Sequence, residues 1–169
     1  VASKFSKINT VKLDTDKLSV SKEAKKRGSG YLNVALFGVD SRDNDLDKGT
    51  RSDTIMIASL NKKTMKVKIA SIYRDTLSEQ EDGTLNKINA AYSYGGPEGA
   101  LSVLNKNLDM NIEHYVTVNF NSMIDIVDSV GGIDIDVQED EMPYICGYVQ
   151  EIMKVTGKLS PGVTEPGTQ

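Results

Sequence analysis

The sequence is poor in the residues that most often carry redox, zinc or nucleophilic chemistry: it has one cysteine, one histidine and no tryptophan among 169 residues. Because Cys146 is the single cysteine, the chain has no internal disulfide and no cysteine-based zinc pattern. His114 lies within a strand-like segment, far in sequence from Cys146, which disfavours a Cys-His or Ser-His arrangement. We interpret His114 as structural and Cys146 as a buried or spare thiol.

Long hydrophobic runs are also absent. No segment is apolar for long enough to span a bilayer, and no signal-peptide pattern is present. The chain starts at Val1 and ends in the turn-rich segment 160–169, so we expect that both ends have been trimmed. An upstream membrane anchor is therefore compatible with this sequence, and its length predicts one domain with a substantial core.

Negative charge predominates, with 24 acidic and 20 basic residues and a net charge of -4. The balance is uneven, because residues 1–30 hold 8 Lys and Arg against 3 Asp and Glu, which leaves 12 basic and 21 acidic residues in 31–169. An acidic body argues against nucleic acid as the main partner, since phosphate neutralisation needs a broad basic face. We interpret residues 1–30 as a basic arm. A solvated linker is the favoured interpretation, and a segment that lies near an anionic membrane surface is the alternative.

Three short aliphatic segments, 32–39, 54–60 and 65–73, are bounded by turn residues and predict buried strands. The polar connection 61–64 suits a hairpin, so the second and third strands should pair antiparallel. Apart from Lys66 and Lys68 in the third segment, the charged residues stand at the strand margins. If the first strand also pairs antiparallel with the second, all the charged clusters meet at one end of a single sheet.

The remaining chain alternates helix and strand patterns after a turn at Asp82-Gly83. We expect a helix from Pro97, with Leu101, Leu104 and Leu108 on one face, and then a strand over 114–118. A second helix should be capped by Asn121 or Ser122, point Met123, Ile124, Val127 and Val130 inward, and end at Gly131-Gly132. A strand over 133–137 and a helix over 144–155 should follow. Helices covering a sheet predict an α/β or α+β fold.

Asp40 and Asp53 are the best metal candidates, because magnesium takes few carboxylate ligands and keeps waters or substrate phosphates for the rest. Each aspartate has an alternative role in a local turn. The alternating Asp43, Asp45 and Asp47 resemble the start of an EF-hand loop, but Lys48 occupies its glycine position, and a flexible acidic loop is the better interpretation.

Three arginines, Arg42, Arg51 and Arg74, accompany these carboxylates at the strand margins. The planar guanidinium binds phosphate oxygens in a bidentate manner, which lysine cannot do. The alternative is that Arg51 and Arg74 form structural salt bridges with Asp53 and Asp75. Two further polar groups are weaker signals: Lys87 and Asn89 within a packed segment, and the Gly95-Gly96-Pro97 turn, which could offer backbone N–H groups to an anion.

Six segments together resemble the LytR-CpsA-Psr family of bacterial envelope proteins. In chain order, over residues 31–137, they are LNVALFGVDSR, RSDTIMIASLN, IYRDT, KINAAYSYGGPEGA, HYVTVNF and IDIVDSVGGIDIDV. The resemblance implies an α-β-α sandwich around a central mixed sheet, with an apolar tunnel for a lipid. It also implies that the catalytic domain, 31–169, is truncated at its C terminus, and some relatives carry there a second cysteine that would pair with Cys146.

The family's implied activity is transfer of a glycan polymer, such as teichoic acid or capsular polysaccharide, from a polyprenyl-pyrophosphate carrier to peptidoglycan. A magnesium ion, or manganese in its place, assists, and hydrolysis of the pyrophosphate is an expected side reaction. The implied location is the extracytoplasmic face of the membrane, with one anchoring helix upstream of this chain. Two alternatives stay open: a transcriptional regulator, for which we see no basic helix-turn-helix, and a noncatalytic polyprenyl-phosphate binding module.

Matched motifs assign a role to each candidate residue. The resemblance implies magnesium ligands at Asp40 and Asp53, catalytic roles for Arg51, Arg74 and Asp75, and pyrophosphate contacts from Arg42, Arg51, Arg74, Lys87 and Asn89.

Overall fold

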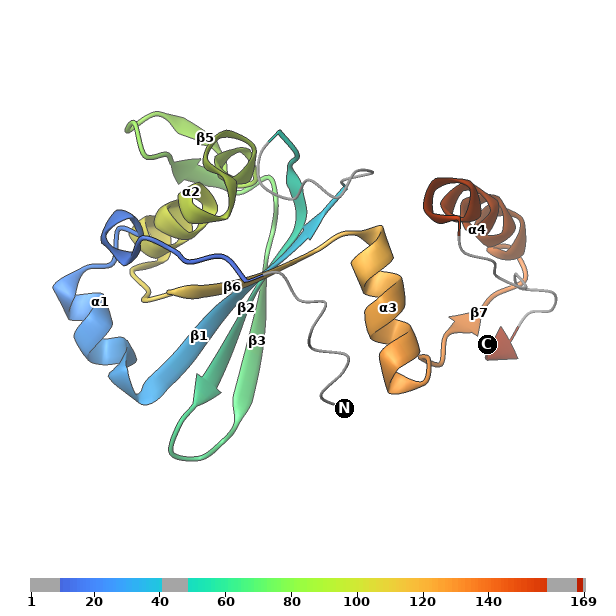
Figure 1. The fold of residues 1–169 in the computed structure, drawn as a ribbon, viewed down its shortest axis with the longest axis horizontal. Coiled ribbons are helices and arrows are strands. Elements are labelled where there is room, and N and C mark those ends of the chain that lie inside the picture. Colours follow the sequence, from blue (N-terminus) through green and yellow to red (C-terminus); the bar gives the residue numbers. More distant parts are fainter. Residues whose placement is uncertain (1–9, 41–48, 158–166, 169) are drawn as a thin grey trace.

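The computed structural model describes residues 10–40, 49–157 and 167–168. Its elements in chain order are η2 (Thr15–Lys17), α1 (Lys22–Arg27), η3 (Gly28–Gly30), β1 (Tyr31–Val39), β2 (Ser52–Asn61), β3 (Val67–Ile72), β4 (Leu77–Glu79), β5 (Leu85–Lys87), α2 (Ala90–Leu108), β6 (His114–Val118), α3 (Phe120–Val130), β7 (Asp136–Val137), α4 (Met142–Thr156) and β8 (Gly167–Thr168). Figure 1 shows the central sheet with α2 on one side of it. The predicted α/β class with a central mixed sheet is confirmed.

The central sheet has the strand order β3-β2-β1-β6. β1 and β3 each pair antiparallel with β2, and β6 pairs parallel with β1. The predicted hairpin between the second and third strands is confirmed, and Asn61 stabilises it, because its Oδ1 accepts hydrogen bonds from the backbone N–H groups of Lys63 and Thr64 at 3.0 and 2.9 Å. β3 is shorter than predicted, since Met65 has a positive φ of 56° within the turn.

The hydrophobic core lies between this sheet and α2. Alternate residues of β1, among them Ala35 and Phe37, point to this side and are buried. Leu101 and Leu104 of α2 pack against them, as the sequence predicted, whereas Leu108 is 40% exposed at the end of the helix. On the opposite sheet face, large apolar side chains remain exposed, as at Ile69.

Helix α2 begins seven residues earlier than predicted. Gly96 has φ 62° and ψ -155°, a conformation outside the helical region, and it divides Ala90–Leu108 into two helical segments, the second beginning at Pro97. The prediction found that second segment and missed the first. Ala90, Ala91 and Tyr92 are buried, so their helical conformation is supported by tertiary packing rather than by an amphipathic stripe.

The basic N-terminal segment packs on the body from Leu13 onward. Leu18 is fully buried in the core, and the Ser19 hydroxyl lies 2.7 Å from that of Ser102 on α2. The basic residues of α1 also have partners, because Lys25 pairs with Glu113 at 3.2 Å and Arg27 pairs with Asp109.

Helices α3 and α4 lie apart from the central sheet (Figure 1). The predicted cap of α3 was wrong: Asn119 precedes the helix, and its side chain accepts a hydrogen bond from the Ser122 backbone N–H. The inward orientation was also predicted for four residues of α3. It is wrong for Met123 and Val130, which are 49% and 70% exposed, whereas Ile124 and Val127 are half-buried. No residue of α3 is fully buried.

The end of α3 at Gly131-Gly132 is confirmed by their positive φ angles of 92° and 100°. The strand predicted over 133–137 is reduced to Asp136–Val137, because its partner β8 is two residues long. The predicted C-terminal helix is confirmed as α4. Within the described ranges, no helix is both long and apolar enough to cross a membrane.

Candidate active site

The charged clusters lie at one edge of the sheet, as predicted. Val39, the last residue of β1, pairs with Ser52, the first residue of β2, and Ile72 at the end of β3 pairs with Ile55. Asp40, which follows β1, and Arg51, which precedes β2, therefore lie at the same end of the sheet. Residues 73–75, which follow β3, lie at this end too, on the other side of β2. The antiparallel pairing alone brings together residues that are up to 35 positions apart.

At this edge, a β-bulge changes the direction of the Asp53 side chain. Gly38 pairs with Thr54 and Val39 pairs with Ser52, so Asp53 is the extra residue between the two pairs. A bulge bends its strand and changes the direction of the side chain it carries. Gly38 allows the close approach, because a Cβ atom there would lie 3.0 Å from the Thr54 Cβ.

Arg74 joins two carboxylates. Its Nη1 donates to Asp53 Oδ1 at 2.5 Å, and its Nε lies 3.8 Å from Asp75 Oδ2. All three side chains are about half exposed, so ligand atoms can reach them. The alternative that Arg74 pairs with Asp53 and Asp75 thus describes the structure, and it does not exclude phosphate binding, because the exposed guanidinium has further donors.

Lys87 completes the cluster from a different element. The backbone N–H of Ile88 donates to Thr76 O at 2.8 Å and that of Asn89 donates to Arg74 O at 3.2 Å, which places the end of β5 beside residues 74–76. The Lys87 ammonium then lies 2.6 Å from Asp75 Oδ1. This hydrogen bond is the main cause that lowers the pKa of Asp75 below its ordinary value, with smaller electrostatic contributions from Arg74 and Arg51.

The other predicted site residues differ in their accessibility. Asp40 and Arg51 are exposed at the edge of the sheet. Asn89 is 5% exposed and immediately precedes α2, so it lies under the cluster rather than on its surface. Arg42 lies outside the described residues, as does the acidic loop of Asp43, Asp45 and Asp47.

Two hydroxyl groups beside the cluster were not singled out from the sequence. Thr50 Oγ1 and Ser52 Oγ are buried without a hydrogen-bond partner among the described residues. Ser52, between Arg51 and Asp53 in the sequence, is fully buried. A single serine at this position forms no motif that would have identified it from the sequence. Its unpaired hydroxyl adds a polar group beneath the charged edge.

The carboxylates suit a magnesium ion that shares its ligands with a substrate. Asp40 and Asp53 are exposed oxygen donors on neighbouring strands, and the described residues contain no group of three or more His, Cys, Asp or Glu side chains that could hold a metal. Magnesium is commonly held by one or two carboxylates together with waters and substrate phosphates. The donor set thus fits a shared cation and does not form a closed site made by the protein alone.

Comparison with known proteins finds relatives that are similar to this chain in sequence and in fold. The polyisoprenyl-teichoic acid–peptidoglycan teichoic acid transferase TagU of Bacillus cereus is 39% identical over 126 residues, which are 74% of this chain and 40% of TagU. The solved structure of TagT (YwtF) with bound octaprenyl pyrophosphate lipid has a TM-score of 0.60 at 25% identity, covering 95% of this chain and 55% of that one.

A second structure, of TagT bound to LI-WTA, has a TM-score of 0.61 at 25% identity, covering 95% of this chain and 53% of that one. This chain thus spans about half the length of the solved relatives and two fifths of TagU. The sequence profile of the LytR_cpsA_psr family matches residues 1–162. Since that match covers nearly the whole sequence, this chain belongs to the LytR-CpsA-Psr family.

Proposed function

We propose that this chain is the catalytic part of a phosphotransferase that attaches a glycan polymer to peptidoglycan. The donor is a polyprenyl-pyrophosphate-linked glycan, with teichoic acid or capsular polysaccharide as its polymer. The names of TagU and of the TagT complexes support this choice. The observation that carries the proposal is the position of Arg74, held between Asp53 and Asp75 at the sheet edge where Lys87 also ends.

The reaction exchanges a phosphoanhydride bond of the donor for a phosphate ester bond to the acceptor. A hydroxyl oxygen of the acceptor attacks the phosphorus that bears the glycan, the bond from this phosphorus to the bridging oxygen breaks, and polyprenyl phosphate leaves. The hydroxyl proton passes to solvent or to the departing phosphate. Water in place of the acceptor would give the hydrolytic side reaction. The enzyme must therefore gather and stabilise negative charge on the phosphates.

The basic side chains supply that stabilisation. Arg51 and Arg74 bind phosphate oxygens through their guanidinium groups, Lys87 adds a compact positive charge, and Arg42 is expected to join them. Asp75 orients Arg74 and Lys87, a role that suits a carboxylate whose pKa is lowered and which is therefore a weak base. Asp40 and Asp53 would hold magnesium or manganese, which when bound neutralises phosphate charge as a Lewis acid.

The donor also implies a location. Peptidoglycan and its polyprenyl carriers meet at the outer face of the cell membrane, so we propose that the catalytic domain works there, held by an anchor upstream of this chain. The polyprenyl tail would lie in an apolar tunnel. TagT with its bound octaprenyl pyrophosphate supports a lipid as the partner.

Calorimetric titration with geranylgeranyl pyrophosphate, in magnesium and in chelator, tests the proposal. Arg74→Ala should weaken binding about a hundredfold, because it removes a group that contacts the pyrophosphate directly. Arg27→Ala is the matched control, since Arg27 is equally exposed and pairs with Asp109 away from the site. Equal affinities for the two variants would refute the assignment, and binding without turnover of a glycan-linked donor would favour the noncatalytic module.

A further inference from the structure

A cavity of about 220 Å³ lies between the β4–β5 hairpin and α2. Its hairpin side is polar and is lined by Gln80, Glu81, Asp82, Thr84 and Asn86. Asn86 immediately precedes Lys87 on β5, so the lining of the cavity comes within one residue of the charged cluster along the chain. None of Arg51, Asp53, Arg74, Asp75 or Lys87 lines it. The cavity is therefore a neighbour of the proposed phosphate site and not a part of it.

The helix side of the cavity is lined by small residues and one aromatic residue. Ala91, Gly95, Gly99 and Val103 form its apolar part, and Tyr94 also lines the cavity, with 72% of its surface exposed. A Cβ atom added at Gly95 would meet no atom within 4 Å, so there is open space in front of this backbone. An exposed aromatic ring beside this apolar part offers a surface on which a flat or ring-shaped ligand can stack.

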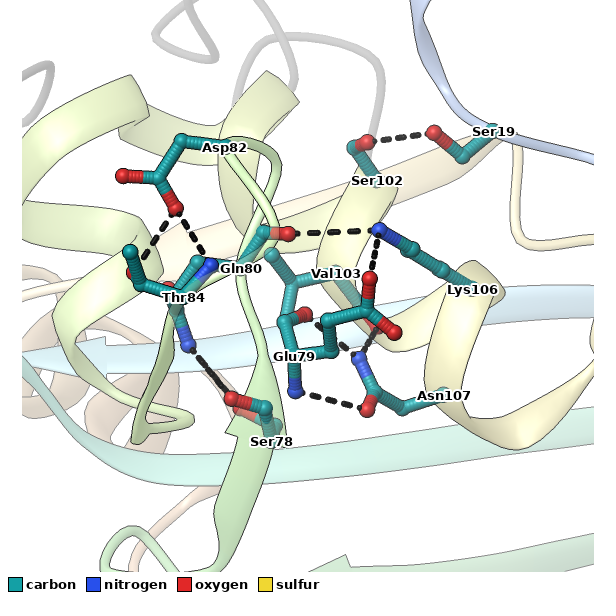
Figure 2. A network of polar contacts seen from close by, with 10 residues as sticks. All are labelled: Ser19, Ser78, Glu79, Gln80, Asp82, Thr84, Ser102, Val103, Lys106 and Asn107. Atoms are coloured by element: carbon teal, nitrogen blue, oxygen red, sulfur yellow. Dashed lines mark hydrogen bonds and ion pairs between the residues drawn. The ribbon is translucent and has the colours of Figure 1, made fainter.

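Polar contacts to α2 hold the hairpin wall in place (Figure 2). The backbone of Glu79 makes two hydrogen bonds with the Asn107 side chain, its N–H donating to Oδ1 and its carbonyl accepting from Nδ2, each at 2.9 Å. The Lys106 ammonium contacts Glu79 Oε1 at 2.8 Å and Gln80 O at 3.3 Å. A wall that is already ordered loses little entropy when a ligand binds.

The hairpin tip is ordered by its own side chains. Asp82 Oδ1 accepts hydrogen bonds from Thr84 N–H at 2.9 Å and Thr84 Oγ1 at 2.7 Å (Figure 2). These bonds lower the pKa of Asp82, so its carboxylate stays charged. Gln80 Nε2 donates to Ser78 Oγ at 3.0 Å, which fixes the amide that lines the cavity.

The chemistry of the lining excludes three ligand classes. Glu81 and Asp82 face the cavity and no cationic side chain lines it, which disfavours a phosphate or carboxylate ligand. Two carboxylates line the cavity, and Asp82 Oδ1 already accepts two hydrogen bonds from Thr84, which disfavours a metal. A volume of about 220 Å³ is too small to hold a polyprenyl chain.

Amide, carboxylate and hydroxyl groups opposite an aromatic ring suit a neutral ring with many hydroxyls. We propose that this cavity binds one sugar ring of the acceptor glycan and presents the adjoining hydroxyl to the phosphate site. The inference rests on the proposed function, which requires a sugar hydroxyl as the attacking group. Thr84 is three residues from Lys87, roughly 10 Å along an extended strand. With one ring bound in the cavity, a hydroxyl of the next sugar would therefore come within reach of the phosphate site.

The test is an NMR titration of the whole chain with the peptidoglycan disaccharide N-acetylglucosamine–N-acetylmuramic acid, with the lactyl carboxyl group capped as an amide so that the ligand is neutral. We expect amide shifts confined to residues 80–86 and 94–99. Tyr94→Ala should weaken binding about three- to tenfold, because a stacked aromatic ring is lost. Gly95→Leu should abolish binding, because its side chain enters the open space in front of Gly95.

Two matched controls lie on α4. Tyr148→Ala removes a ring that is 66% exposed, and Gly147→Leu also adds a side chain where no atom lies within 4 Å. Both should leave the titration unchanged. Absent shifts, shifts elsewhere, or equal effects of the α2 and α4 variants would overturn the inference.

Geranylgeranyl pyrophosphate binding, measured on the same variants, separates the two proposals. Donor binding that persists in Tyr94→Ala and Gly95→Leu, without disaccharide shifts in the unaltered chain, would reject the sugar site and leave the phosphotransferase standing. Disaccharide binding at the cavity without donor binding would reject the phosphotransferase, and with it the acceptor role, and would leave a cavity that binds sugar alone.

Discussion

Arg74 and Lys87 approach Asp75 from different elements, and this shared carboxylate sets their positions before a ligand arrives. The Lys87 contact is the shorter of the two, at 2.6 Å against 3.8 Å for Arg74 Nε. Incoming phosphate oxygens would compete with Asp53 and Asp75 for donors that are already aligned. At the scale of single residues, the site is therefore a set of exchangeable ion pairs.

The pKa of Asp75 should respond to this pairing. Lys87→Met removes the main cause of the lowered value, so the pKa should rise toward the ordinary 3.8. Because the folded-state pKa lies below the unfolded one, the pairing stabilises the fold above the unfolded value and ceases to do so as pH falls through the folded value. Carbon-detected NMR titration of the Asp75 carboxyl measures the shift. Lys106→Met, which removes the partner of Glu79, should leave it unchanged.

The break in α2 is the decisive feature at the scale of elements. The segment before Gly96 continues from β5 and thus follows Lys87, while the segment from Pro97 packs Leu101 and Leu104 into the core. A continuous straight helix could not satisfy both directions. Gly96 adopts a conformation that is essentially restricted to glycine.

Gly96→Ala should therefore lower the free energy of unfolding by about 1–3 kcal/mol. Gly95→Ala, one residue earlier, should be neutral or slightly stabilising, since Gly95 has an ordinary φ and alanine has the higher helix propensity. Urea unfolding monitored by circular dichroism compares the two variants. Equal losses would show that the break does not depend on the glycine conformation.

At the scale of the whole molecule, burial is concentrated on one side of the sheet. Leu18 from the N-terminal segment, Phe37 from β1 and Leu101 from α2 share one core, whereas α3 has no buried residue among those described. Stability should therefore depend on the α2 side of the sheet, and the amphipathic face of α3 should contribute little.

Substitutions in the two regions should differ accordingly. Leu101→Ala should cost about 2–5 kcal/mol, because it leaves a cavity in a fully buried position. Val130→Ala, at a residue of α3 that is 70% exposed, should change stability by no more than about 0.5 kcal/mol. Chemical denaturation of both variants measures the difference. A large loss for Val130→Ala would mean that α3 packs against the body in solution.

Local signals in the sequence determined the central strands, the Asn61 hairpin and the meeting of Asp40, Arg51 and Arg74 at one edge. Strand patterns and turn residues are local signals. When a short turn connects two antiparallel strands, these signals also determine which strand ends lie side by side. The motifs were equally sufficient for the family, because six of them occur in order.

Long-range pairing decided what the sequence left open. The bulge at Asp53 depends on the register between β1 and β2, and the contact of Lys87 with Asp75 depends on backbone hydrogen bonds that join residues twelve or more positions apart. The buried start of α2 and the exposed face of α3 were mispredicted for the same reason. Whether an apolar side chain is covered depends on which element packs over it, and no local pattern contains that information.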